Sequence, residues 1–245
     1  MTLDPGQWRY ARSLTLSYLS QNQIANAVNL AGTYHKKLPG NYLVGLLYAK
    51  TLFLNSQYKD ALLQLQKINM LPAEGSTEGI QLYKEAQLML SLQEMKKGKH
   101  KEALNHISLA RLWPENLGSG KPYEDDIDER LEDWLAYQNY VRLKNQVAAR
   151  QMLDKIISFD KTAVEEGSNI SSANSLITAW ALEKTGKPDQ AQTYLQQLLN
   201  KNPRNVWAQW AMNVYNRKVS QPPETKTTDG NYSVLKNWME ISGEK

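Results

Sequence analysis

The sequence predicts an all-α protein of about five helical hairpins, followed by a terminal helix and a C-terminal tail. Three observations lead to this fold. Apolar residues recur at helical spacing along most of the 245 residues. One pattern returns five times: a turn with Gly or Asn, a bulky residue, an Ala, and a Leu or Ile four residues later. Prolines follow several of the copies, as expected where a helix ends.

Each copy of the pattern marks the second helix of a hairpin, because a further helical stretch precedes it. The five segments are NQIANAVNLA (22–31), SQYKDALLQLQKI (56–68), GKHKEALNHISLA (98–110), NQVAARQMLDKI (145–156) and GKPDQAQTYLQQL (186–198). Their equivalent alanines, Ala27, Ala61, Ala103, Ala149 and Ala191, are 34, 42, 46 and 42 residues apart. The residues beyond 34 fall between hairpins. We therefore expect long loops at 72–79, 114–125 and 160–171, along one edge of a stack.

The loop at 114–125 contains GSGK, which resembles the end of a phosphate-binding loop. That motif needs a first glycine at 115 and a hydroxyl after the lysine, and the chain has Glu115 and Pro122 there. We interpret the stretch as a connection between repeats. It begins at Pro114 and ends with Asp125 or Asp126 as the N-cap of the next helix.

The repeated pattern resembles the tetratricopeptide repeat (TPR), a helix–turn–helix unit of 34 residues. Agreement is best at 172–203, where the residues at repeat positions 8, 11, 15, 20, 24, 27 and 32 are Ala179, Leu182, Gly186, Ala191, Leu195, Leu198 and Pro203. The resemblance implies a right-handed α-solenoid that occupies residues 1–218. Small residues at positions 8 and 20 would let the two helices of a hairpin approach closely.

A second resemblance covers residues 80–215. They are similar to the helical-repeat region of large bacterial proteins that carry an upstream, carbohydrate-enzyme-like domain of unknown function. A PENLG-x-G-P-Y loop recurs in that family, and here it comprises Pro114, Glu115, Asn116, Leu117, Gly118, Gly120, Pro122 and Tyr123. The resemblance implies that the chain is a piece of a larger protein. The activity of an upstream domain cannot be transferred to this chain.

The predicted inner, concave surface of the stack is apolar. Its ligand-binding candidates are Leu46, Phe53, Leu88, Leu92, Met95, Trp134, Val141, Leu176, Trp180, Trp207 and Trp210. A long apolar groove rarely stays exposed to water. We therefore expect it to bind a peptide, a neighbouring domain or the chain's own tail. If the register is shifted by one residue, these side chains instead lie in the core between helices.

The tail carries its own apolar pattern. Residues 219–231 have the composition of an extended linker. Residues 232–245 follow, with Val234, Leu235, Trp238 and Met239 on one face of a short helix. We expect this helix to return to the groove near Trp180 and Trp210, or to cover the last repeat.

No catalytic, cofactor-binding or metal-binding residues are expected. His35, His100 and His106 are scattered, and the acidic run at 124–129 lacks the glycine and glutamate of a calcium loop. The net charge of +4 is mild, and the KKGKHK cluster at 96–101 is typical of a helix end, so we expect no nucleic-acid partner. No segment is long and apolar enough to insert into a membrane. The N-terminus has no signal-peptide pattern, and the compartment and the oligomeric state stay open.

These observations predict a protein-interaction or scaffolding module that is not an enzyme. Its partner would be a protein or peptide, including an upstream domain of the same polypeptide. One alternative is a non-catalytic accessory module that positions a glycan-acting domain. The other is an all-α carbohydrate-binding or carbohydrate-active protein that uses tryptophan stacking and carboxylates.

Overall fold

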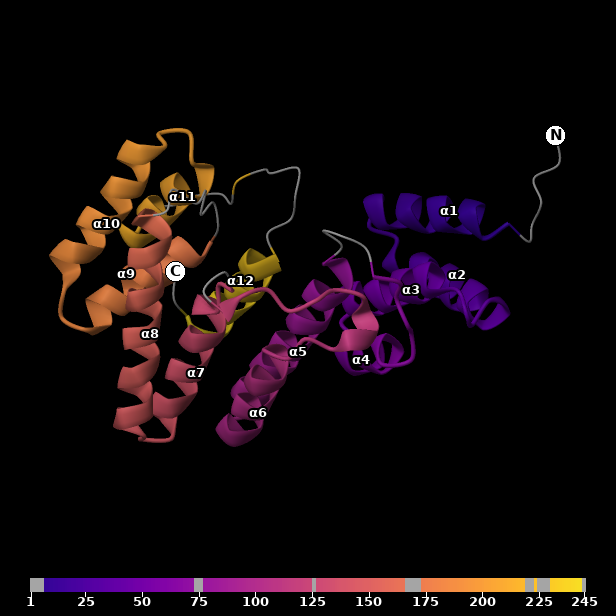
Figure 1. The fold of residues 1–245 in the computed structure, drawn as a ribbon, viewed down its shortest axis with the longest axis horizontal. Coiled ribbons are helices and arrows are strands. Elements are labelled where there is room, and N and C mark those ends of the chain that lie inside the picture. Colours follow the sequence, from indigo (N-terminus) through magenta and orange to yellow (C-terminus); the bar gives the residue numbers. More distant parts are fainter. Residues whose placement is uncertain are drawn as a thin grey trace. The chain divides into compact units, whose positions relative to one another are not determined.

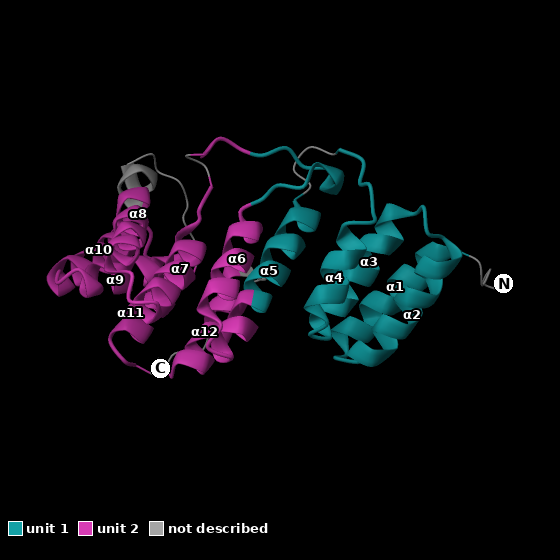
Figure 2. Ribbon diagram, turned by 90° about the horizontal axis from the view of Figure 1, so that it is seen from below, with its two compact units in different colours: residues 1–90, 112–121 teal, residues 91–111, 122–245 magenta. Residues whose placement is uncertain are grey.

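The computed structural model describes residues 7–72, 77–124, 127–165, 173–218, 223 and 230–243. Within these ranges every regular element is a helix (Figure 1). The predicted all-α fold class is therefore confirmed. The chain divides into two compact units (Figure 2). Unit 1 comprises residues 1–90 and 112–121, and unit 2 comprises residues 91–111 and 122–245.

The helices follow one another as five hairpins. The hairpins are α1 (Trp8–Ser20) with α2 (Ile24–Lys37), α3 (Tyr42–Leu54) with α4 (Tyr58–Leu65), α5 (Glu78–Lys96) with α6 (His100–Ala110), α7 (Arg130–Arg142) with α8 (Gln146–Glu165), and α9 (Asn174–Lys184) with α10 (Pro188–Lys201). A terminal helix, α11 (Val206–Tyr215), and a tail helix, α12 (Gly230–Ser242), come last. A 3₁₀ turn, η1 (Glu115–Leu117), lies between α6 and α7.

The same turn closes all five hairpins. One residue in it takes the left-handed conformation, with φ between 56° and 78°: Asn22, Ser56, Gly98, Lys144 or Gly186. The next residue donates a backbone hydrogen bond to the carbonyl five residues before it, as from Lys187 to Leu182 at 3.0 Å. This is the Schellman pattern, which satisfies carbonyls at the end of a helix. The end of α11 has the same turn, with Arg217 at φ 56°. Helix α11 therefore ends as the first helix of a sixth hairpin would.

Close approach of the paired helices depends on the predicted alanines. Ala27, Ala61, Ala103 and Ala191 are 0% exposed, and Ala149 is 2% exposed. In unit 1, α2 packs on α3 and α1 packs on α3, and in unit 2, α9 contacts α7, α8, α10 and α11. The first helix thus contacts the first helix of the next hairpin in α1–α3 and α7–α9, and α9 contacts the terminal helix α11 in the same way, which is how helical repeats stack.

The loop after α6 is held against the rest of unit 1. The side-chain amide of Asn116 donates to the carbonyls of Leu65 and Ile68, at 2.9 and 2.8 Å. The backbone carbonyl of Asn116 accepts a bond of 2.8 Å from Met70. Leu117 is 1% exposed. The loop therefore satisfies carbonyls at and just beyond the end of α4, although Asn116 is about fifty residues further along the chain.

Two predicted boundaries were wrong. Asp125 and Asp126 lie outside the described residues, but α7 begins only at Arg130, with Glu129 at the N-cap position. Asp128 and Glu129 bind arginine side chains, and the Asp128 carboxylate also accepts the backbone N–H of Arg130 at 3.1 Å, which places the helix start after both acidic residues. The expected loop at 160–171 is also too long, because α8 continues to Glu165 and residues 166–171 lie outside the described ranges. The arrangement of the long loops along one edge stays a prediction.

Candidate functional site

Three tryptophans from three helices of unit 2 form one aromatic cluster. Trp134 of α7 and Trp180 of α9 stack, with ring centroids 5.4 Å apart. Trp238 of α12 lies 5.5 Å from each of them, edge-on to Trp134. Stacked and edge-to-face pairs at such distances are favourable beyond the area that they bury. The tail helix therefore contacts the first helices of two successive hairpins.

A second aromatic cluster lies at the other end of α12. Tyr232 of α12 is 5.2 Å from the ring of Trp207 and 5.4 Å from that of Trp210, both on α11. Trp207 and Trp210 are themselves edge-on, 5.6 Å apart. Burial raises the pKa of the Tyr232 hydroxyl, with a smaller contribution from Glu240. Helix α12 is thus anchored by one aromatic residue near each end.

The face of α12 between the anchors is buried. Val234 and Leu235 are 0% exposed and Trp238 is 2% exposed. Lys236 and Glu240, on the opposite face, are exposed. The apolar face covers the side of α7, α9 and α11 that the sequence predicted to be concave. We name this surface of unit 2, formed by Trp134, Trp180, Trp207 and Trp210, the aromatic groove.

The other predicted groove residues occupy two kinds of position. Four are interior, at most 6% exposed: Leu46, Leu88, Leu92 and Leu176. Three are more accessible: Phe53, which packs on Tyr58, Met95, and Val141, which is 37% exposed. Leu46 and Leu88 belong to the core of unit 1, and Leu92 and Leu176 to the core of unit 2. Whether any of these residues binds a ligand stays a prediction.

Sequence reasoning missed two aromatic members of the site. Tyr232 lies three residues before Leu235, a helical spacing that makes the two side chains neighbours on one face. Tyr137, whose ring is 5.3 Å from that of Trp134, extends the first cluster. Burial raises its pKa. It lies one turn beyond Trp134 on α7, which is a local signal that helical periodicity could have supplied.

A buried ionic network holds the helices behind the aromatic groove. Arg130, at the start of α7, is 1% exposed. Its guanidinium donates to both carboxylate oxygens of Asp128, at 2.9 and 2.7 Å, and to the Thr178 hydroxyl of α9 at 3.0 Å. Asn174 of α9 donates to the same carboxylate at 2.9 Å. These bonds fix α7 against α9, the two helices that carry Trp134 and Trp180.

Burial and pairing act in opposite directions on the acidic residues of this network. Burial alone would raise the pKa of Asp128, but the charge and hydrogen bonds of Arg130 and Asn174 outweigh it and lower that pKa. For Asp133, burial prevails over the attraction of Arg111, and its pKa is raised. Arg111 binds both Glu129 and Asp133. The network therefore joins the start of α7 to both α6 and α9.

Metal ligation has no support among the residues that the structure describes. No group of three or more His, Cys, Asp or Glu side chains lies close enough there to hold a metal ion. His100 instead shares a hydrogen bond of 2.9 Å with Asn139. No helix in the described ranges is long and apolar enough to cross a membrane.

Comparison with known proteins returns helical-repeat structures. The chain is similar to two crystal structures of MamA, at 14% and 16% identity, over 88% and 83% of this chain and 97% and 98% of theirs, with TM-scores of 0.41 and 0.40. It is also similar to a structure described as a Podosopora anserina kinesin light chain with nearly identical TPR-like repeats, at 15% identity, over 83% of this chain and 98% of that one, with a TM-score of 0.46. No protein-family model and no curated protein matches the chain. Similarity at this level identifies no partner.

Proposed function

We propose that the protein is a non-catalytic interaction module whose aromatic groove binds an amphipathic helix of a partner protein. The proposal rests on the packing of α12, which contacts α7, α9 and α11 through Tyr232 and Trp238. A groove that accepts one amphipathic helix has the shape and chemistry for another. Buried aromatic anchors of this kind dominate the binding energy of protein interfaces.

In this proposal α12 is the resident competitor of the partner. A tethered helix acts at an effective concentration of about millimolar, set by the length of its linker. A partner must therefore bind the groove more tightly than α12 does. One feature of the groove would let a partner helix bind more tightly than α12. Among the described residues, the buried Nε1 of Trp134 has no hydrogen-bond acceptor.

A buried donor without an acceptor costs about 1–3 kcal/mol. A partner helix that presents a carbonyl, carboxylate or amide oxygen to Trp134 would recover that cost. Helix α12 supplies aromatic and aliphatic contacts to this region and no such acceptor. The partner is therefore a helix with two aromatic anchors, spaced as Tyr232 and Trp238 are, and one polar acceptor near the second anchor.

The test uses the full chain with its own helix disabled by Tyr232→Ala and Trp238→Ala. A labelled peptide of residues 230–243 should bind this variant saturably, and the wild-type chain more weakly. A peptide carrying Trp238→Ala should lose binding. Ile241, which is 40% exposed, provides the matched control, and a peptide carrying Ile241→Ala should bind as the parent does. If the folded double variant fails to bind the parent peptide, the groove is not a helix-binding site.

A second candidate is an accessory module that positions a glycan-acting domain of the same polypeptide. It rests on the resemblance of the loop at 114–123. The docking of Asn116 on unit 1 supports it, because the loop presents a fixed surface there. Leu71 and Leu112 remain 68% and 51% exposed in that unit. The double substitution of both leucines by Asp should abolish co-purification with an upstream domain, and unchanged co-purification would reject this candidate.

A carbohydrate-binding role has less support. Stacking on a sugar needs an open tryptophan face. Trp180 is only 9% exposed and packs on Trp134 and Trp238. The ring of Trp180 therefore offers no open face on which a sugar could stack.

A further inference from the structure

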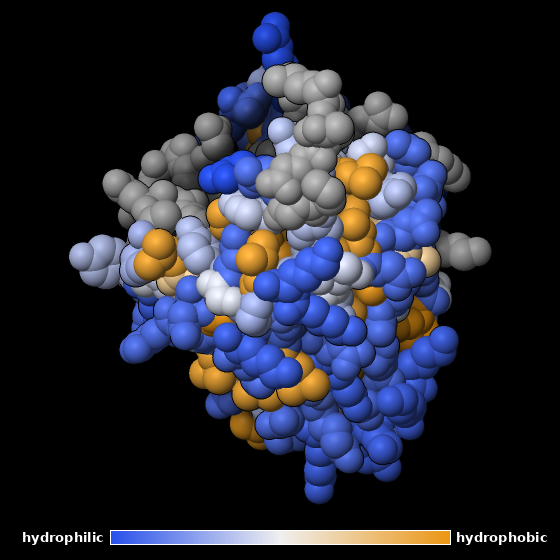
Figure 3. Space-filling model, turned by 90° about the vertical axis from the view of Figure 1, so that its right-hand side faces the viewer, coloured by the Kyte–Doolittle hydropathy of each residue, from blue (hydrophilic) through white to orange (hydrophobic). Residues whose placement is uncertain are grey.

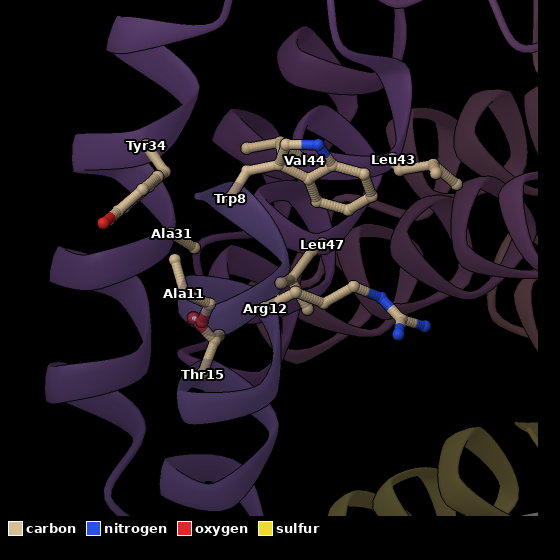
Figure 4. A pocket seen from close by; sticks show the side chains of 9 residues that line it. All are labelled: Trp8, Ala11, Arg12, Thr15, Ala31, Tyr34, Leu43, Val44 and Leu47. Carbon is tan, nitrogen blue, oxygen red and sulfur yellow. Dashed lines mark hydrogen bonds between the residues drawn. The ribbon is translucent and has the colours of Figure 1, made fainter. Parts of the chain in front are cut away.

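Unit 1 contains a second apolar concavity, independent of the aromatic groove. A cleft opens between α1, α2 and α3, and its walls include Trp8, Tyr34, Leu43 and Leu47 (Figure 4). Ala11, Thr15 and Ala31 form its small-residue floor. Leu43 is 40% exposed, so part of the apolar lining is accessible to a ligand. The free space inside the cleft is only about 10 Å³, about that of one water molecule. A ligand side chain would therefore lie against its partly exposed rim at Trp8 and Leu43 rather than enter it.

Positive charges surround this cleft. Arg12 lines it, and the Arg9 guanidinium lies 4.8 Å from the centre of the Trp8 ring. The Lys37 ammonium lies 5.1 Å from the centre of the Tyr34 ring. Two aromatic walls of the cleft are thus each covered by a cation. Within the described part of the chain, Arg9 and Arg12 form no salt bridge.

The sequence concentrates positive charge in this region. Residues 5–59 contain six Lys or Arg and no Asp or Glu. The whole chain has 29 basic and 25 acidic residues, so the remainder has 23 basic and 25 acidic ones. The mild net charge of +4 therefore hides a strongly basic first part and a slightly acidic remainder. Apolar patches set among hydrophilic residues are visible on the face in Figure 3.

We infer that this cleft is a docking site for an acidic, extended peptide of a partner protein, which lays one apolar side chain against Trp8 and Leu43 at the rim of the cleft. Charge complementarity carries the choice of partner, because the cations at the cleft have no carboxylate nearby in the unit's first three helices. The apolar lining of the cleft requires that the peptide's anchor side chain be apolar. The duplex of a nucleic acid fits less well, since the cleft is small and apolar and the cations already cover the ring faces on which bases would stack.

This docking site is separate from the aromatic groove in residues and in chemistry. The groove takes a helix with aromatic anchors, whereas the cleft takes a single anchor flanked by carboxylates. Binding at the cleft should weaken as salt is added, because exposed charges are screened. Binding at the groove should change little with salt. The two sites can therefore be distinguished in one protein.

The probe is a labelled synthetic peptide in which one leucine is flanked on both sides by glutamates. We expect saturable binding to the full wild-type chain by fluorescence anisotropy. Replacement of the glutamates by glutamines, or of the leucine by glycine, should each weaken binding about tenfold or more. The peptide of residues 230–243 should not compete, which separates this test from that of the aromatic groove.

Two variants locate the site. Arg12→Glu changes an exposed cleft residue and should weaken binding about tenfold or more. Lys59→Glu makes the same charge change on exposed α4, away from the cleft lining, and should have little effect. Leu43→Ser removes an apolar wall at a partly exposed position and should also weaken binding, with thermal melting used to show that both variants are folded.

Three results would overturn the inference. Equal loss with Arg12→Glu and Lys59→Glu would mean that only the overall charge attracts the peptide. Absence of saturable binding to the wild-type chain would reject the docking site. Displacement of the bound peptide by a single-stranded oligonucleotide, or by vesicles of anionic phospholipid, together with tighter binding of that competitor, would assign the basic face to nucleic acid or to lipid instead.

Discussion

The interiors of the two units are stabilised in different ways. The close packing of unit 1 depends on glycines, whose lack of a side chain lets neighbouring residues approach. A Cβ added to Gly45 of α3 would lie 2.5 Å from Ile68 Cγ2, and one added to Gly32 of α2 would lie 3.0 Å from the Tyr48 ring. Unit 2 depends on polar partners, since Arg130, Glu132 and Asn139 are at most 1% exposed. The same hairpin is thus stabilised by close backbone approach in one unit and by buried hydrogen bonds and an ion pair around Arg130 in the other.

This difference has a consequence for function. The polar network of unit 2 fixes α7 and α9, so that Trp134 and Trp180 keep a rigid, stacked arrangement for a helix to bind. Among the residues that the structure describes, the side chains that line the cleft of unit 1 form no ion pair, and they come from the three helices α1, α2 and α3. The comparison predicts that added atoms damage unit 1 most, and that lost charges damage unit 2 most.

The largest expected effect is in the polar network. Asp128→Ala removes a bidentate carboxylate from the buried Arg130 guanidinium, which should lower the free energy of unfolding by about 3–5 kcal/mol. Asp154→Ala is the matched control. It also removes a carboxylate from an arginine, Arg150, but both side chains are 57% exposed, and the loss should be within about 0.5 kcal/mol. Urea unfolding of both variants measures the difference, and equal losses would remove the distinction between the units.

The second largest loss of stability is expected at buried alanines that occupy equivalent positions in the two units. Ala61 of α4 and Ala191 of α10 occupy equivalent positions and are both 0% exposed. Replacement of either by Leu should overpack a hairpin and cost about 1–3 kcal/mol. Thermal and urea unfolding should show similar losses in the two variants. Unchanged stability in both would mean that the repeat register is wrong.

A smaller effect is expected at Gly45. Alanine favours a helix over glycine by up to about 1 kcal/mol, whereas the contact with Ile68 should cost about 1–3 kcal/mol. We therefore expect Gly45→Ala to destabilise the protein by up to about 2 kcal/mol. Gly40→Ala serves as the control, because nothing lies within 4 Å of an added Cβ there. Stabilisation by Gly45→Ala would contradict the close packing described for unit 1.

Acid should act on unit 2 through Asp128. The folded-state pKa of Asp128 is lowered, so its contribution to stability is full above the unfolded pKa of about 3.9 and is lost as the pH falls through the folded value. Asp133 acts in the opposite sense, since burial raises its pKa. At neutral pH neither titrates. Urea midpoints from pH 7 to acid should fall less steeply for Asp128→Asn than for the wild type, and parallel curves would contradict this assignment.

The sequence predicted the helices well because the repeat imposes local constraints. Alanines at equivalent positions and turn residues such as Gly98 and Gly186 mark each hairpin within a few residues. Ser56 and Lys144 take the same left-handed conformation without being glycine, so the alignment of repeats revealed these turns where residue type would not.

The contacts between distant segments were not predictable in the same way. Arg130 meets Thr178, and Asn116 meets Leu65, about fifty residues away in each case. The acidic run before α7 was interpreted as a helix start because its partners, Arg111 and Arg130, could not be assigned from spacing. The sequence predicted from the apolar face that the tail helix returns near Trp180 and Trp210, but its contacts with Trp134 and Trp207 could not be assigned from spacing.

The most direct test of the central claim is a double-mutant cycle between Trp180 and Trp238. Each residue is replaced by Ala alone and then both together, and the free energies of unfolding are measured in urea. If α12 packs in the aromatic groove, the two substitutions should be coupled by about 0.5–1.5 kcal/mol, the range for aromatic pairs in contact. Additive losses, with no coupling between the two positions, would show that α12 does not occupy the groove.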